Sequence, residues 1–265
     1  TSIDDWYVGK TYGEIWGYET DRLYQKEDFV YDNSGNLVTI KSTDGYMVYQ
    51  TVDGVTQGKL QNSSNFKFGP GDVKFKDQNG DGVINPGSRL ADDHGDLKVI
   101  GNSTPRYEYG FRLGAEFKGV DLSVFFQGVG KRELWGNSSM TIAGFNSSDG
   151  AMAQAIAGDF WKEDRTDAYY PRPYNNANSN NTNNMQIQTR YLLDMSYFRL
   201  KNLTLGYSLP VKLMRKINIS KLRVYAALEN FFTFDHLKGL PIDPEEVPGY
   251  SLFNTDDNYN ASRTG

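Results

Sequence analysis

Hydrophobic and polar residues alternate along two adjacent segments of this 265-residue chain. From 107 to 117 every second residue is apolar or aromatic, and each residue between them is glycine or charged. A repeat of two residues predicts a β-strand, because successive side chains of a strand point to opposite faces. A turn at 118–121, which contains Gly119, leads to a second alternating segment at 122–127. The pattern predicts a long β-hairpin.

A second pair of alternating segments lies at 197–209 and 220–234. Pro210 is expected to end the first of them, and residues 211–217 are expected to form one or two helical turns. The two connections within hairpins are therefore short, whereas the connection between the hairpins, 131–190, has about 60 residues. Short turns at one rim and long loops at the other are typical of outer-membrane barrels.

The long connection has its own character. Its alanine-containing segment 149–161 predicts a helix, and seven of the eleven residues from Tyr174 to Asn184 are asparagine. Segments with little to bury stay mobile, so the tip at 175–184 is expected to be the most mobile part of the chain. The rest reads as one irregular loop, and long loops often carry binding function.

Alternation by itself fits two classes of protein. In a soluble barrel or sandwich the apolar face points to a core, whereas in a membrane barrel it points to lipid and the polar face lines the lumen. Strands of nine to eleven residues match a tilted membrane crossing, while strands of soluble proteins average about five or six. Strand length and loop asymmetry therefore favour the membrane class.

Composition narrows the function. The chain has no cysteine and two histidines, which excludes disulfides and thiolate metal sites and argues against a histidine-rich one. A net charge of −5 without a basic RNA-binding signature argues against nucleic acid as a partner. No apolar run has the length of a transmembrane helix. Acids cluster at 163–167, but no catalytic pair stands out, so the chain is not expected to be an enzyme.

An acidic glycine loop precedes the first hairpin. Counted from Asp77, side-chain oxygens occupy positions one, three and five and glycine occupies position six, which is the spacing of an EF-hand calcium loop. Position twelve is Ser88 instead of a bidentate Glu, so an acid within 92–96 is expected to complete the shell. A plain Asx-Gly turn without an ion is the alternative. The candidate calcium ligands are Asp77, Asn79, Asp81, the carbonyl of Val83, and Asp93.

Several stretches together resemble one family. They are Gly-Glu-Ile-Trp-Gly-Tyr at 13–18, the acidic loop with its flanks at 71–84, and the segments 99–110, 121–129, 197–207 and 222–231. In this order they resemble the C-terminal part of the SusC/RagA family of TonB-linked outer-membrane proteins. The resemblance implies an all-β fold, the C-terminal portion of a large transmembrane antiparallel β-barrel with long extracellular loops. Residues 1–265 are then a segment of the receptor barrel, with the plug domain and the final strand absent from it.

The resemblance also implies function and partners. A protein of this family imports oligosaccharides or peptides across the outer membrane of a Gram-negative, Bacteroidetes-like cell. It works with a surface SusD-like lipoprotein lid and with the TonB complex, through the N-terminal part that is missing here, and it contacts outer-membrane lipid. The alternative from the residues alone is a soluble calcium-stabilised carbohydrate-binding β-module, whose aromatic loops stack on sugars.

The membrane reading assigns a direction to each face of the first hairpin. The residues expected to face lipid are Phe111, Leu113, Leu122, Val124 and Phe126. The residues expected to face a wet lumen are Arg112, Glu116 and Gln127. The long connection at 131–190 is expected to lie outside the cell.

Overall fold

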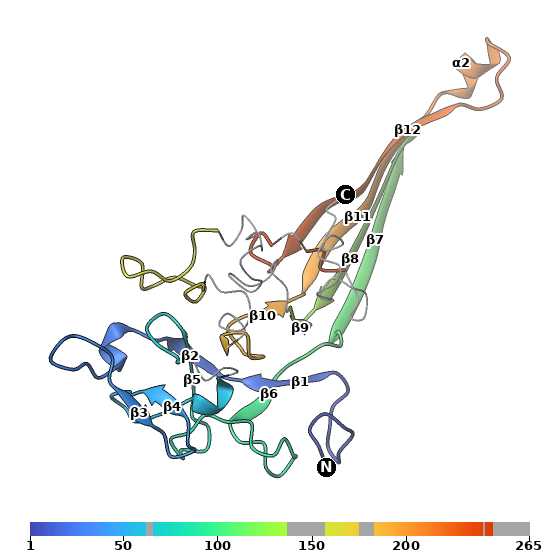
Figure 1. Ribbon diagram of the computed structural model, residues 1–265. Helices are drawn as coiled ribbons and strands as arrows, with labels where there is room; N and C mark the ends of the chain where they lie inside the picture. Colours follow the sequence, from blue (N-terminus) through green and yellow to red (C-terminus); the bar gives the residue numbers. More distant parts are fainter. Residues whose placement is uncertain (62–65, 137–156, 175–182, 241, 246–265) are drawn as a thin grey trace. The chain divides into compact units, whose positions relative to one another are not determined.

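The structure is a computed structural model that describes residues 1–61, 66–136, 157–174, 183–240 and 242–245. The chain divides into two compact units (Figure 1). Unit 1 contains Thr1–Ser103, Leu134–Leu193 and the described residues 239, 240 and 242–245, and unit 2 contains Thr104–Glu133 and Asp194–Lys238. Among the described residues, no helix has the length and apolar character that crossing a membrane demands.

Unit 2 is built on one antiparallel sheet of four strands in the order β12-β11-β8-β7. Its strands are β7 (Tyr107–Phe117), β8 (Val120–Gly130), β11 (Tyr197–Ser208) and β12 (Arg223–Asp235). They have 11 to 13 residues each, so the predicted long hairpins are confirmed. A short helix, α2 (Val211–Arg215), lies in the connection between β11 and β12, where helical turns were predicted.

The first hairpin turns more tightly than the sequence suggested. Only Lys118 and Gly119 lie outside the strands, and both have positive φ, 49° and 85°. Positive φ at both central residues is the signature of a type I′ turn, whose twist matches that of the flanking strands. Val120 and Asp121, which were assigned to the turn, therefore begin the second strand.

Unit 1 is assembled from short strands. The pairs are β1 (Glu14–Tyr18) with β6 (Leu97–Asn102), β2 (Thr20–Leu23) with β5 (Val73–Phe75), and β3 (Thr39–Lys41) with β4 (Met47–Tyr49). Two 3-10 turns, η1 (Lys26–Asp28) and η2 (Gly58–Leu60), join them. The strands β9 (Glu133–Trp135) and β10 (Leu192–Asp194) pair with each other at the chain positions where the two units meet in sequence.

The core of unit 1 forms where aromatic side chains pack between these pairs. Tyr24, Phe66, Phe75 and Ile84 are fully buried. Gly71 is required there, because its φ is +89° and an added Cβ would lie 2.5 Å from the ring of Trp161. The turn at Gly71 is thus packed against an aromatic ring.

Two predictions about the long connection fail where the structure describes it. Residues 157–161, the end of the predicted helix, are not helical. The Trp161 N–H instead donates a hydrogen bond to the Tyr170 carbonyl at 3.0 Å, as in a strand pair. Asn183 and Asn184, placed in the mobile tip, are fully buried. Residues 149–156 and 175–182 lie outside the described residues.

Candidate functional site

The register of the unit 2 sheet sorts its side chains onto two faces. Directly paired residues share a face, and the pairs Phe111 with Phe126 and Leu113 with Val124 put the predicted lipid-facing residues together. Arg112 pairs instead with Phe125, and Gln127 with Gly110, so these residues share the opposite face. The two faces predicted from the alternation are therefore present in the sheet.

The apolar face continues across all four strands in rows. The central rows are aliphatic: Leu113, Val124, Leu203 and Leu228 form one, and Ala115, Leu122, Leu205 and Ala226 the next. At the end toward the tight turn the row is Phe117, Val120, Tyr207 and Val224. At the other end Tyr109, Phe111, Phe126, Phe198, Phe232 and Phe234 form a ring cluster. Aromatic residues thus border an aliphatic band on both sides.

The ring cluster is held by stacking. The rings of Phe126 and Phe198 lie 5.2 Å apart between centroids and 8° from parallel, and Phe111 approaches Phe126 at 5.0 Å. Tyr109 lies across Gly128 of the next strand, where an added Cβ would come within 2.5 Å of its ring. A ring covering a strand glycine in this way protects a weak point of the sheet.

This face is exposed in spite of its composition. Leu113 is 59% exposed and Phe117 is 71% exposed, and most large side chains of the other rows are also accessible. Contiguous apolar surface of this extent is rare on soluble proteins and marks contact with another apolar medium or partner.

The opposite face is polar and charged. The Arg112 guanidinium lies 5.4 Å from the centre of the Phe125 ring, and Asn202 and Glu229 continue that row. Nearer the tight turn, Arg223 donates two hydrogen bonds to the carboxylate of Asp121, at 2.9 Å and 2.5 Å. An ion pair on a face that meets water adds little to the stability of the protein, and both charges of this pair lie on the polar face of the sheet.

The acidic loop of unit 1 folds around its own carboxylates. Asp77 accepts hydrogen bonds from the backbone N–H groups of Gly80 at 2.7 Å and Gly82 at 2.8 Å. Asn79 accepts from the N–H of Asp81 at 3.0 Å, and Asp81 accepts from the N–H of Val83 at 2.7 Å. Because both glycines have positive φ, these turns close without strain.

The remaining candidate ligands lie nearby. The Val83 carbonyl accepts a hydrogen bond from the side chain of Asn85 at 2.9 Å. Asp93 bonds the backbone N–H and the hydroxyl of Ser88, which is position twelve of the loop. Asp96, within the expected range 92–96, binds the loop backbone itself, accepting from the N–H groups of Gln78 and Asn85 at 2.8 Å each. The structure thus joins Asp96, more directly than Asp93, to the loop.

Negative charge gathers at this loop. Burial raises the pKa of Asp96, and the charges of Asp77 and Asp81 raise it further, against the two backbone hydrogen bonds that lower it. Among the described residues, no group of three or more His, Cys, Asp or Glu side chains has the geometry of a metal site. Any ion here would therefore take amide, carbonyl or water oxygens as part of its shell.

Comparison with known proteins relates the chain to one family. TonB-dependent receptor P3 of Formosa agariphila is 31% identical over 176 residues, which cover 66% of this chain and 16% of that protein. TonB-dependent receptor P26 of the same organism is 28% identical over 175 residues, with the same coverage. The chain is homologous to a segment of TonB-dependent receptors. The resemblance drawn from the sequence motifs is confirmed, and no protein-family model matches the chain.

The match spans 16% of the length of the two relatives. Solved structures of the RagAB peptide transporter, and of the RagAB peptide importer in its open-open state, each align with a TM-score of 0.48 and 21% identity. The alignments cover 87% and 90% of this chain and 20% of each of those chains. No functional inference follows from a likeness of this size. Both relatives are named as receptors.

The sequence did not predict one buried hydrogen-bond network in unit 1, which is centred on Asp72. Asp72 is fully buried, and its carboxylate accepts hydrogen bonds from the Tyr174 hydroxyl at 2.7 Å, from Asn184 Nδ2 at 2.7 Å and from the Gly69 N–H at 2.8 Å. Burial raises the pKa of Asp72, and nearby Arg172, at 3.8 Å, opposes that rise. Asn184 also accepts from the N–H of Val73 at 2.8 Å. The network ties Arg172, Tyr174 and Asn184 to Asp72 and to Val73, the first residue of strand β5.

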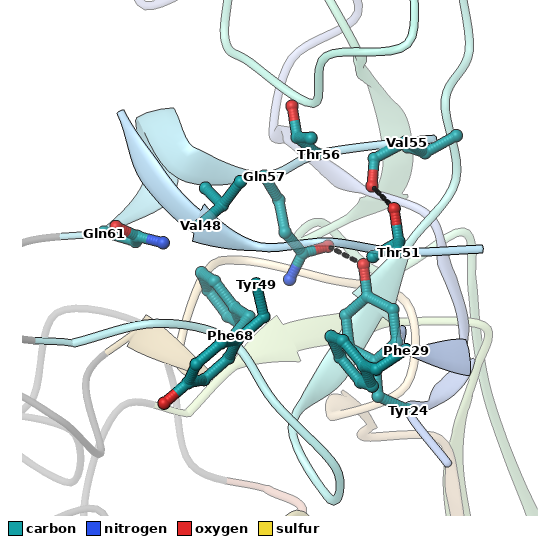
Figure 2. Close-up of a pocket in the computed structure, with 10 residues that line it drawn as sticks. All are labelled: Tyr24, Phe29, Val48, Tyr49, Thr51, Val55, Thr56, Gln57, Gln61 and Phe68. Carbon is teal, nitrogen blue, oxygen red and sulfur yellow. Dashed lines mark hydrogen bonds between the residues drawn. The ribbon is translucent and has the colours of Figure 1, made fainter. Parts of the chain in front are cut away.

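A small pocket in unit 1 is structural. It is lined by Tyr24, Phe29, Val48, Tyr49, Thr51, Val55, Thr56, Gln57, Gln61 and Phe68 (Figure 2). The buried Gln57 side chain donates to the Val73 carbonyl at 2.8 Å and accepts from the Phe75 N–H at 3.3 Å. Its amide therefore completes the open edge of β5, and the space left has room for about one water molecule.

Proposed function

We propose that unit 2 forms part of the membrane-crossing wall of an outer-membrane TonB-dependent transporter. The observation that supports this most directly is the exposed apolar face with aromatic residues at both borders. Membrane barrels have such a band, flanked by aromatic girdles at the two interfaces, with polar residues on the other face. A soluble module would need a cover for this face, and the membrane supplies one.

The dimensions of the sheet agree with this proposal. Tyr109 and Phe117 mark the two aromatic borders and lie eight residues apart on β7. At about 3.3 Å per residue they are about 26 Å apart along the strand. A tilt of about 40° reduces this to a height of about 20 Å, close to the band of about 25 Å in known membrane barrels.

The activity of the whole receptor is part of the same proposal. The motif resemblance supports import of an oligosaccharide or peptide into a Gram-negative, Bacteroidetes-like cell, with energy from the TonB complex and a SusD-like lipoprotein lid. The polar face, with Arg112, Gln127 and Glu229, would then line the lumen. The resemblance also supports an extracellular position for the connection between the hairpins.

Calcium at the acidic loop is the second part of the proposal. Asp77, Asn79 and Asp81 carry the side-chain oxygens, and Asp96 adds a carboxylate bound to the loop backbone. A divalent cation would lower the mutual repulsion of these carboxylates. Its role would be to hold the loop in one shape, since no reacting group accompanies it.

A cysteine scan tests the wall directly, because the chain has no native cysteine. Single cysteines at positions 111 to 116 carry a spin label, and the protein is studied in native-like membranes. Collisions with oxygen report lipid, and collisions with a water-soluble nickel chelate report water. We expect oxygen to dominate at 111, 113 and 115 and the chelate at 112, 114 and 116.

A label at Lys118, in the turn, serves as the control for water access. Two results would overturn the proposal: odd positions shielded from both reagents, as in a protein core, or equal access on both faces. Recovery of the protein from cells without detergent would also support the soluble alternative.

A further inference from the structure

Positive charge is concentrated in one part of the sequence. Between Asp194 and Glu229 the chain has seven basic residues and no acidic one, although its net charge is −5. Four of the seven, Lys212, Arg215, Lys216 and Lys221, lie in the connection between β11 and β12. We call this connection, residues 209–222, the basic turn.

The basic turn lies at the end of the sheet that carries the tight hairpin turn. Ser208 pairs with Arg223 where the two strands end, and the Ser208 N–H donates to the Gly119 carbonyl at 2.7 Å. Figure 1 shows α2 beyond this end of β11 and β12. Lys118, in the neighbouring turn, adds a fifth cation at the same end.

Three of the four cations of the basic turn lie on one side of α2. Lys212, Arg215 and Lys216 are three and four residues apart across α2, which puts them on one side of the helix. Within the described residues none of these three, nor Lys221, has a carboxylate within ion-pair distance. Arg223 differs, because Asp121 neutralises it. Four positive charges therefore remain available to an outside anion.

Exposed apolar side chains accompany these charges. Val211 is 57% exposed and Ile217 is 56% exposed, while Met214 is 2% exposed and packs inward. Short segments that combine basic residues with exposed aliphatic ones are typical of the membrane interface, where apolar groups enter the acyl boundary and cations meet headgroups. In water alone the exposed aliphatic groups have no stabilising contact.

We infer that the basic turn binds anionic phospholipid headgroups in the leaflet on the short-turn side of the membrane. The inference rests on the proposed function, because it requires the strands to cross that membrane. It follows from charge complementarity and from continuity, since the turn directly joins Tyr207 and Val224 of the border row through the last pair of the strands, Ser208 with Arg223. Short turns of outer-membrane barrels lie on the periplasmic side, so the phospholipid leaflet there is the assigned occupant.

A quenching experiment tests which lipid lies beside the turn. A fluorophore is attached to Ile219→Cys in the intact protein, reconstituted in mixed phosphatidylcholine and phosphatidylglycerol membranes. One lipid at a time is brominated, so that quenching reports its local share. We expect phosphatidylglycerol to be enriched several-fold at the label and the enrichment to fall with added salt, because exposed charges are screened.

A variant with all four cations of the turn changed to Gln should lose this enrichment, by up to about fivefold for each charge. The matched control changes Lys26, Lys41, Lys59 and Lys162 of unit 1 to Gln and should keep it. Equal quenching by the two lipids would overturn the inference and leave the membrane wall intact. Quenching by neither lipid, together with lipid contact at position 113, would also overturn it and would indicate a protein partner. If neither position 113 nor position 219 contacts lipid in the protein with its native cations, the proposed function itself would be overturned.

Discussion

A single arginine in the middle of the apolar face provides the sharpest test of the membrane assignment. Leu113 belongs to the central aliphatic row and is 59% exposed, so an arginine at this position has room at the surface and its introduction removes little buried packing. If the face meets lipid, an arginine near the midplane costs about 2–4 kcal/mol. That range corresponds to a folding equilibrium lower by about 30-fold to about 700-fold.

The cost should also depend on depth. Phe117, in the row beside the tight turn, would lie at the interface, where the same substitution costs about 0–1 kcal/mol beyond the loss of the ring. Ala115→Arg should give an intermediate value. Ser123→Arg is the matched control, because Ser123 precedes Val124 of the central row but lies on the polar face. Its cost should stay near zero.

The measurement is the denaturant midpoint of the protein in vesicles, followed by intrinsic fluorescence and compared across the four variants. Differences between variants are more reliable here than absolute stabilities, because a large membrane protein need not unfold in two states. A flat profile from 113 to 117, or an equal cost for Ser123→Arg, would refute the assignment of this face to lipid.

Three further predictions concern unit 1. Lys76 and Lys98 lower the pKa of Glu19 to about 2, so its contribution to stability is present above pH about 4.5 and lost as pH falls toward 2. Because the two lysine side chains are nearly half exposed, Glu19→Gln should cost less than about 1 kcal/mol in a thermal melt at pH 7, and a larger loss would contradict this expectation. Tyr174→Phe removes a donor to buried Asp72 and should cost about 1–3 kcal/mol, whereas a neutral result would mean the network relaxes. Calcium should raise the melting temperature of the wild type but not of Asp77→Ala, and an equal response of both would exclude this loop as the site.

The strands of unit 2 could be predicted because their signal is local. Alternation at 107–117 reports the period of one strand, and the same face reappears in the partner strand through register. The tight turn was predicted two residues too long, because the strand propensity of Val120 extends pairing to the turn itself. Local sequence information therefore explains both why the strands were predicted correctly and why the length of the turn was not.

The Asp72 network could not be predicted for the opposite reason. Asn184 is separated from Asp72 by 112 residues, and nothing near either residue marks them as partners. An asparagine-rich stretch predicts a solvated loop, but a buried carboxylate requires donors, and Asn184 and Tyr174 supply them. The same limit applies to the acidic loop. The spacing of Asp77, Asn79 and Asp81 is local, whereas the path of the chain decides that Asp96 reaches the loop backbone.

Large apolar side chains are packed into a core in unit 1 but form an exposed face in unit 2, and this contrast supports the proposed function. In unit 1 a core of large aromatic residues, among them Tyr24 and Phe75, is fully buried, and polar groups such as Gln57 complete the strand edges inside. In unit 2 residues of the same kinds, such as Phe117 and Leu113, are exposed. A chain able to build a dry core at one place would gain about 25 cal/mol per Å² by burying these residues too, if water were the only solvent. Regular rows on the exposed face, aliphatic in the centre and aromatic at the borders, are expected where the solvent changes from water to lipid across the height of the sheet.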